Sequence, residues 1–284
     1  MPSPSAPRPW TRWATFVRRW ALAYLVVAVA LAFFLFPIVW MFGMAVKQPA
    51  EYFSSPPVWL PRAPDLSHFR QLVLNRSITS LVNSLVIAGG ATLLALLVGC
   101  PAAYSMARFN TGGRNFAFWV LSQRMLPPIA IVFPVFLLFR IIGWVDTYQG
   151  LTLLYAAFNA PYVIWMMRGY FRDIPVEVEE SARVDGASTL RVFWSISLPL
   201  AAAGLIATGV FTFIFSWNEF LFAVVLTRAR VVTVPVAMSG YFGSQSTFWG
   251  EAGALSLIAS APVFVLSLLV QRYLTRGLTL GAVK

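Results

Sequence analysis

The chain has 284 residues, of which 59% are hydrophobic and only 11% are charged, and its mean hydropathy is +0.74. A soluble globular domain usually has about a quarter charged residues, because its surface must be hydrated. The composition therefore excludes an ordinary soluble domain and predicts a protein embedded in lipid. The net charge of +11 comes from basic residues that mostly flank apolar blocks. This pattern is typical of the positive-inside rule and disfavours nucleic-acid binding.

One cysteine and one histidine restrict the sites that the chain can build. Cys100 lies inside an apolar block, and His68 lies in a polar stretch. These two residues exclude an intrachain disulfide and a Cys/His metal site within one chain. We expect Cys100 to be a small packing residue and His68 to be a solvated loop residue.

Six apolar blocks approach the length of about 20 residues that a membrane-spanning helix requires. We expect an all-α membrane protein, a bundle of six transmembrane helices, preceded by a disordered cytoplasmic tail over residues 1–19. The first block is too long for a signal peptide and is interpreted as an uncleaved helix. Arg124 and the pair Pro127-Pro128 interrupt the third block, which should be kinked or broken there. The predicted spans cover approximately residues 20–46, 81–104, 116–139, 150–167, 200–226 and 253–271.

The basic residues orient the bundle. With a cytoplasmic N-terminus, thirteen Arg and Lys residues fall in cytoplasmic segments and seven in external ones, while Arg124 falls within a span. This excess predicts a multi-pass membrane protein with both termini in the cytoplasm. Residues 48–77, which are rich in proline, then form an external loop, and residues 168–199 form a cytoplasmic loop.

The cytoplasmic loop is longer than a connection between two packed helices requires. Pro175 suits the first turn of a helix, and Gly186 suits the left-handed residue that follows one. Ser188 can cap a second short helix, which Pro199 would end. We therefore predict a helix–turn–helix that offers a knob to another protein. The loop contains half of the acidic residues in the chain, namely Asp173, Glu177, Glu179, Glu180 and Asp185.

This loop resembles the "EAA" loop of binding-protein-dependent ATP-binding-cassette permeases. The family pattern is Glu-Ala-Ala, three residues, Gly, nine residues, Ile, one residue and Leu-Pro. The chain has the same spacing, with Ser181 in place of the first Ala, over Glu180, Ser181, Ala182, Gly186, Ile196, Leu198 and Pro199. The resemblance implies that these residues, together with Glu179 and Asp185, dock into a cytoplasmic ATPase and couple its closure to the spans. The alternative is an amphipathic loop without a partner.

Three further stretches resemble the carbohydrate-uptake, maltose-type branch of that family. They are the segment 216–221, the turn 143–148 and the C-terminal residues 277–284. The resemblance implies an importer permease of the prokaryotic plasma (inner) membrane that moves sugar-like solutes by alternating access. Its expected partners are a second permease subunit in a heterodimer, a dimer of ATPase subunits, an external solute-binding protein and membrane lipid. ATP and Mg would bind to the ATPase, and no cofactor is expected on this chain.

Trp217, Asn218 and Glu219 are the candidates for contact with solute. Glu219 is the one acidic residue of its span, and ionisable groups in membranes tend to face the bundle interior or water. An aromatic face beside an amide and a carboxylate suits polyhydroxy solutes. The alternative, slightly favoured because Arg228 is close in sequence, is a structural role in which Glu219 caps or pairs with a neighbouring helix.

The sequence lacks the motifs of a self-sufficient enzyme. Neither Lys47 nor Lys284, the only lysines, lies in a phosphate-binding Gly-x-x-x-x-Gly-Lys-Ser/Thr pattern, and there is no Gly-x-Ser-x-Gly motif. We expect no catalytic and no metal-ligating residues, and ATP hydrolysis on a separate subunit. Two alternatives stay open: a permease for glycerol phosphate or another small polar solute, and a gradient-driven secondary carrier. A membrane enzyme ranks third.

Overall fold

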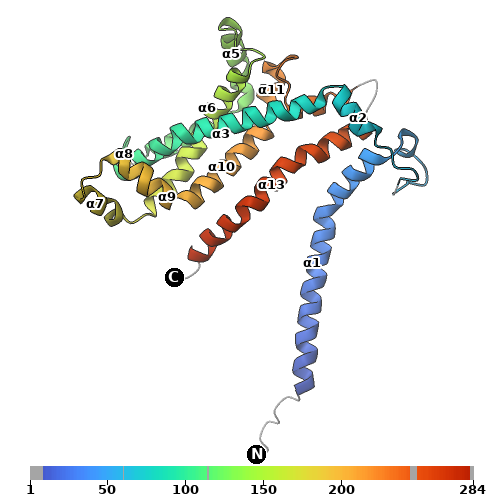
Figure 1. Cartoon of the computed structure of the whole chain (residues 1–284), viewed down its shortest axis with the longest axis horizontal. Helices are drawn as coiled ribbons and strands as arrows, with labels where there is room; N and C mark the ends of the chain where they lie inside the picture. The colour runs from blue at the N-terminus through green and yellow to red at the C-terminus, as the bar shows by residue number, and fades with distance from the viewer. Residues whose placement is uncertain (1–8, 60, 114, 244–247, 282–284) are drawn as a thin grey trace, which may run out of the picture. The chain divides into compact units, whose positions relative to one another are not determined.

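A computed structural model describes residues 9–59, 61–113, 115–243 and 248–281, which fold almost entirely into helices (Figure 1). The predicted all-α class is confirmed. The described helices are α1 Pro9–Val46, η1 Pro49–Glu51, α2 Ser67–Leu74, α3 Ser77–Arg108, α4 Phe116–Ser122, η2 Gln123–Met125, α5 Pro128–Ile141, α6 Tyr148–Arg172, α7 Val176–Val184, α8 Thr189–Val192, η3 Phe193–Ser197, α9 Leu198–Leu200, α10 Ala202–Trp217, α11 Leu221–Leu226, α12 Val234–Ser239 and α13 Trp249–Gly281.

The chain divides into two compact units, and the first contains residues 1–69 and 249–257. Its main element, α1, begins at Pro9, so the disorder predicted for residues 1–19 does not hold for residues 9–19; residues 1–8 lie outside the described part. The reason is that a helix already nucleated by an apolar run gains one hydrogen bond for each residue added. No glycine or proline follows Pro9 in that stretch to stop it.

His68, on α2, is buried in the first unit and is not the solvated loop residue that we expected. Its side chain is only 5% exposed. Nε2 lies 3.0 Å from the Tyr52 hydroxyl and 3.1 Å from the Lys47 carbonyl oxygen, and Nδ1 lies 3.5 Å from a carboxylate oxygen of Glu251. The partners of Nε2 favour burial of the ring, because a hydrogen-bonded polar group loses less by leaving water, whereas Nδ1 has the Glu251 carboxylate nearby but forms no hydrogen bond.

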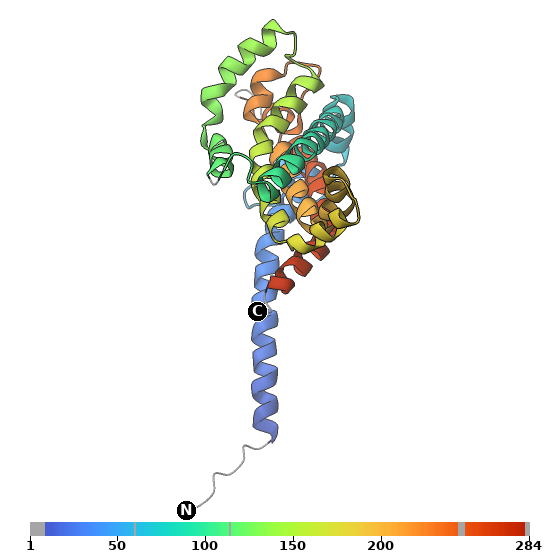
Figure 2. The same cartoon turned by 90° about the vertical axis from the view of Figure 1, so that its left-hand side faces the viewer.

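The second unit, residues 70–248 and 258–284, is built around α3, α6 and α10, which pack side by side (Figures 1 and 2). The two helices α3 and α6 lie close together at Gly99, where an added Cβ would meet the Val163 side chain at 2.6 Å. Cys100 is buried in the same core, as predicted. Small residues on α3 thus allow the two helix backbones to come close enough for dense packing.

Within the described residues, four helices are long and apolar enough to cross a membrane, and two bent pairs raise the number to six if each pair is one span. One bent pair is the predicted third span, in which the segments before and after Pro127 are inclined by 85°. The expected break at Pro127-Pro128 is therefore confirmed, because neither proline has an N–H to continue a helix. The other pair, 189–200 and 202–217, bends by 78°.

The predicted fifth span, residues 200–226, is divided in the structure. Helix α10 ends at Trp217, and α11 begins at Leu221. The cause is the Glu219 side chain, whose carboxylate accepts hydrogen bonds from the backbone N–H groups of Phe222 and Ala223. Such a cap favours the start of a new helix over continuation of the old one.

Candidate functional site

The loop between α6 and α10 folds as a short helix, a tight turn and a second helical segment, as predicted. Helix α7 follows Pro175 and ends in a left-handed Gly186, whose φ is +85°. The Ala187 N–H donates to the Ala182 carbonyl, and the Gly186 N–H donates to the Arg183 carbonyl. This pair of bonds is a Schellman motif, which ends a helix most easily where glycine occupies the left-handed position.

The second helical segment begins at Ser188, whose side chain accepts a hydrogen bond from the Arg191 N–H as the predicted cap. It continues through α8 into a π-helical turn, η3, and then into α9. At the end of the motif, Ile196 and Leu198 are half-buried and Pro199 is exposed. Figure 1 shows α7, α8 and α9 gathered at one end of α3 and α10.

Glu179 fastens this loop to the transmembrane helices. Its side chain is fully buried and accepts a hydrogen bond of 3.0 Å from the Tyr104 hydroxyl, one of 2.9 Å from Arg108 Nε and one of 2.8 Å from the Ser197 hydroxyl. Arg183, one turn further along α7, lies 3.8 Å away. The carboxylate therefore connects α7 with both α3 and η3. A buried carboxylate tolerates this position only when it is paired and hydrogen-bonded.

Aromatic packing and a second bond from Arg108 support this connection. Arg108 also donates to the Ile174 carbonyl just before α7, at 2.9 Å. The Tyr104 ring lies 5.5 Å from Phe171 and 5.2 Å from Phe193, measured between centroids. Tyr104 and Arg108 are one helical turn apart on α3, so that one face of that helix holds both the charge and the ring. Sequence reasoning missed both residues, because nothing near Arg108 in the chain signals a partner 71 positions away.

The outer surface of the loop is exposed and partly apolar. The exposed fraction is 88% for Val184, 72% for Leu190 and 51% for Trp194. The motif residues Glu180, Ser181, Asp185 and Gly186 are exposed as well, and Ala182 is half-buried. Large apolar side chains at the tip of a charged loop are typical of a surface that another protein covers. The structure thus separates Glu179, which faces inward, from the rest of the motif.

The three residues predicted for the solute path have different environments. Trp217 is buried and stacks on Phe213 with ring centroids 5.6 Å apart. Asn218 is exposed, and its amide donates to the Ile214 carbonyl. Glu219 caps α11 and accepts a hydrogen bond of 2.7 Å from the Tyr155 hydroxyl. The structural role considered for Glu219 is therefore present, and the three side chains do not form one binding face.

A second polar network lies at the break of the third span, where Arg124 contacts two other helices. Arg124 Nη1 donates to the Asn159 side chain of α6 at 3.0 Å, and Asn159 in turn donates to the Ser216 hydroxyl of α10 at 3.0 Å. The guanidinium lies over three rings, at 5.7, 5.4 and 4.5 Å from the centroids of Phe158, Tyr162 and Phe215. Among the described residues no carboxylate lies within 4.0 Å of it. Asn159 carries no sequence signal that distinguishes it from a packing residue, and Ser216 was noted only as the first residue of the segment 216–221.

Asp146, in the turn before α6, holds the segment that follows α11. Its two carboxylate oxygens accept hydrogen bonds of 3.0–3.2 Å from four consecutive backbone N–H groups, those of residues 228–231. Partial burial acts to raise the pKa of Asp146, but the four N–H donors together outweigh it, so the pKa lies below its ordinary value.

This geometry predicts a pH-dependent stabilisation by Asp146. Because the folded state lowers the carboxyl pKa, the contribution is present above the unfolded pKa of about 4 and is lost as the pH falls through the lower folded value. Asp146→Asn, which also tolerates the positive φ of +57° at this position, should cost about 1–2 kcal/mol at pH 7. Thermal unfolding of both forms between pH 3 and pH 7 checks this: the difference should shrink toward pH 3, and a constant difference would contradict it.

No group of three His, Cys, Asp or Glu side chains within the described part of the chain is arranged to hold a metal ion. The networks around Glu179 and Arg124 consist of hydrogen bonds and ion pairs between helices, and the network around Asp146 joins two connecting segments by hydrogen bonds. These interactions hold neighbouring elements of the fold together.

Comparisons with known proteins agree with this architecture. The profile of the family "Binding-protein-dependent transport system inner membrane component" matches residues 91–280. The chain is 36% identical to the probable ABC transporter permease protein y4oR of Sinorhizobium fredii, over 93% of this chain and 95% of that protein. It is 34% identical to the trehalose/maltose transport system permease protein MalG of Thermococcus litoralis, over 88% and 91%.

A solved structure has the same fold. It is a chain of a bacterial ABC transporter involved in the import of the acidic polysaccharide alginate, with a TM-score of 0.72 and 26% sequence identity, covering 95% of this chain and 99% of that one. The matched family region contains α6, the complete loop with Glu179 and α10. The chain therefore belongs to the family of inner-membrane components of binding-protein-dependent transport systems, the permease subunits of ABC transporters.

Proposed function

We propose that this chain is one of two permease subunits of an ATP-driven importer for sugar-like solutes and that the α7–α9 loop is its contact with the ATPase. The proposal rests on the contrast between the buried side and the exposed side of the loop. Glu179 is buried and bonded to α3, whereas Val184, Leu190 and Trp194 project outward. A segment that is bonded to a transmembrane helix on one side and exposes apolar side chains on the other can transmit the movement of a partner protein into the membrane.

The mechanism follows from the connections of Glu179. Two ATPase subunits bind ATP and Mg, close on each other and move the docked loops. Displacement of α7 passes through the Glu179–Arg108 ion pair to α3 and through the Ser197 hydrogen bond to η3, which leads into α10. Because α3, α6 and α10 pack together, the core responds as packed helices that shift between two arrangements. This is alternating access driven from outside the chain.

The solute assignment rests on relatives. One is named for trehalose and maltose, and the structural neighbour takes part in alginate import. We propose a saccharide or a related polyhydroxy solute, delivered by an external binding protein to the side of residues 48–77 and 227–251. The second permease subunit would complete the path, and both termini would lie in the cytoplasm. Asn218 and the partly exposed Glu219 are the motif residues that remain accessible to solute.

Leu190→Asp tests the docking proposal. A charge at this exposed apolar position should reduce co-purification of the ATPase subunits at least tenfold and lower ATP-coupled uptake to a similar extent, because it places an unpaired carboxylate in the apolar centre of an interface. Folding should be unaffected, since the side chain is 72% exposed. The measurement is ATPase recovery with the tagged permease, together with uptake into vesicles.

The matched control is Leu74→Asp, a leucine on α2 that is 62% exposed and lies outside the loop. It should leave ATPase recovery unchanged. Full recovery and full uptake with Leu190→Asp would exclude the loop as the coupling contact. Uptake that survives ATP depletion but stops with an uncoupler would instead favour a gradient-driven carrier.

A further inference from the structure

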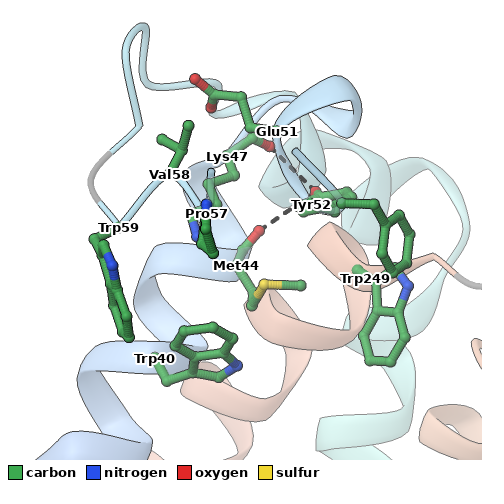
Figure 3. A pocket seen from close by; sticks show the side chains of 10 residues that line it. Trp40, Met44, Lys47, Glu51, Tyr52, Pro57, Val58, Trp59 and Trp249 are labelled. Carbon is green, nitrogen blue, oxygen red and sulfur yellow. Dashed lines mark hydrogen bonds between the residues drawn. The ribbon is translucent and has the colours of Figure 1, made fainter. Parts of the chain in front are cut away.

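The first unit contains a pocket of about 270 Å³ at the end of α1 (Figure 3). Trp40 and Met44 lie along α1 on one side of it, and Trp59 and Trp249 lie at opposite edges. Lys47, the residue that follows α1, also lines the pocket. None of these residues belongs to the loop or to the polar networks described above, so the pocket has no part in the coupling mechanism.

Lys47 is the unusual residue of this pocket. Its side chain is only 4% exposed, and its ammonium nitrogen lies 5.1 Å from the centre of the Trp40 ring. Among the described residues, no carboxylate lies within 4.0 Å of this nitrogen. Only a small part of this side chain reaches water, and the cation–π contact compensates only part of the hydration that a largely enclosed ammonium loses. The pocket is therefore suited to an anion.

Glu51 lines the same pocket, but its carboxylate forms no ion pair with Lys47, because it lies more than 4.0 Å from the Lys47 nitrogen. Both carboxylate oxygens of Glu51 already accept backbone N–H groups, from Gln48 at 3.3 Å and from Arg62 at 3.0 Å. Burial, with smaller effects of the carboxylates of Glu251 and Asp65, raises the pKa of Tyr52 to about 12, so its phenol is neutral at pH 7. The Tyr52 hydroxyl is directed to the carbonyl oxygens at the end of α1.

The position of the pocket along α1 indicates which kind of anion reaches it. Trp20 and Trp40 are twenty residues apart on one helix, which is about 30 Å at 1.5 Å per residue and equals the hydrocarbon thickness of a bilayer. Tryptophan is enriched at both membrane–water interfaces. Lys47 lies about 10 Å further along the chain, within the layer of lipid headgroups. An anion at this depth is most directly supplied by a phospholipid.

We propose that this pocket binds the headgroup of an anionic phospholipid, with its phosphate against Lys47 and its glycerol and upper acyl carbons against Trp40 and Trp59. The charge of the phosphate balances the buried ammonium. The rings provide the apolar contact that a soluble phosphate would not use. A lipid bound in the pocket would fix the depth and rotation of α1 in the membrane, because the pocket lies at the end of that helix.

The test is lipid binding to the full-length chain in its assembled transporter, by native mass spectrometry in detergent with added phosphatidylglycerol or phosphatidylcholine. Lys47→Gln should weaken the tightest phosphatidylglycerol adduct at least tenfold and leave phosphatidylcholine adducts unchanged. Arg62→Gln, an exposed charge in the same loop, is the matched control and should keep wild-type binding. Lys47→Arg should retain most of the affinity, because the cation and its stacking on Trp40 are kept.

A second variant covers the case in which Lys47→Gln fails to fold. Trp59 is 65% exposed, so Trp59→Leu should fold normally and still weaken phosphatidylglycerol binding several-fold. Equal phosphatidylglycerol binding by wild type, Lys47→Gln and Trp59→Leu would overturn the proposal. Glycerol 3-phosphate binding as tightly as phosphatidylglycerol would assign the site to a soluble phosphate and overturn it too. The proposal would also be overturned if Lys47→Gln abolished capture of the solute-binding protein while lipid binding stayed unchanged.

Discussion

Glu179→Ala is expected to reduce ATP-coupled uptake at least tenfold and to destabilise the chain by about 3–5 kcal/mol, the usual cost of removing one partner from a buried ion pair. The Arg108 side chain is only 6% exposed, so the substitution leaves a buried guanidinium without its counter-charge. Tyr104 and Ser197 lose their acceptor in the same step. Thermal unfolding of the purified transporter and uptake into vesicles measure the two effects.

The controls separate coupling from stability. Glu177→Ala removes an exposed carboxylate from the same helix and should leave unfolding within about 0.5 kcal/mol of wild type. The pair Glu179→Leu with Arg108→Met should regain much of the lost stability, because replacing both partners of a buried pair by apolar residues costs little. Uptake should stay low in this double variant, since the link between α7 and α3 is still missing. Wild-type uptake by Glu179→Ala would show that the link is not needed.

Arg124→Met is expected to lower the uptake rate at least tenfold while changing the stability by no more than about 2 kcal/mol. A charged residue at the centre of a membrane helix costs about 2.5–3.5 kcal/mol. The bond to Asn159 and the contacts with three rings return about the same amount. The net effect on folding is therefore small. Uptake is lost because the guanidinium contacts both α6 and α10 and so aligns the broken third span with them.

Two substitutions distinguish this role from a general need for charge. Arg124→Lys keeps the charge but not the planar stacking, so it should restore little of the uptake. Arg140→Met, at an exposed position on α5, should leave uptake close to wild type. If Arg124→Met transports normally, or if Arg124→Lys restores full activity, the alignment role is wrong. Uptake and thermal unfolding measured on the same preparations decide between these outcomes.

Features that depend on neighbouring residues in the chain were predicted correctly from the sequence. The apolar blocks predicted the helices, Pro127-Pro128 predicted the break, and Gly186 and Ser188 predicted the helix ends of the loop. The EAA spacing predicted the family, which the comparisons confirm. Each of these features is local, because hydrogen bonds within a helix, proline geometry and capping involve residues only a few positions apart.

The polar connections required the tertiary structure. The sequence treated Glu179 as one more acidic residue of an exposed loop, but folding buries it against Arg108 on another helix. It left two roles open for Glu219, contact with solute and a slightly favoured structural role, and only packing shows that the carboxylate meets Tyr155 and caps the helix that divides the fifth span. His68 was expected in solvent and lies buried beside Tyr52.

The physical reason is the range of the forces that decide each feature. Hydropathy and backbone capping act locally, so the sequence alone predicted that the chain is embedded in lipid, where most of its helices lie and where the helices of the loop end. Which buried charges meet became clear in the folded chain, because a carboxylate finds its partner through the packing of whole helices. The roles proposed for Arg108, Arg124 and Glu179 therefore depend on the packing of α3, α6 and α10.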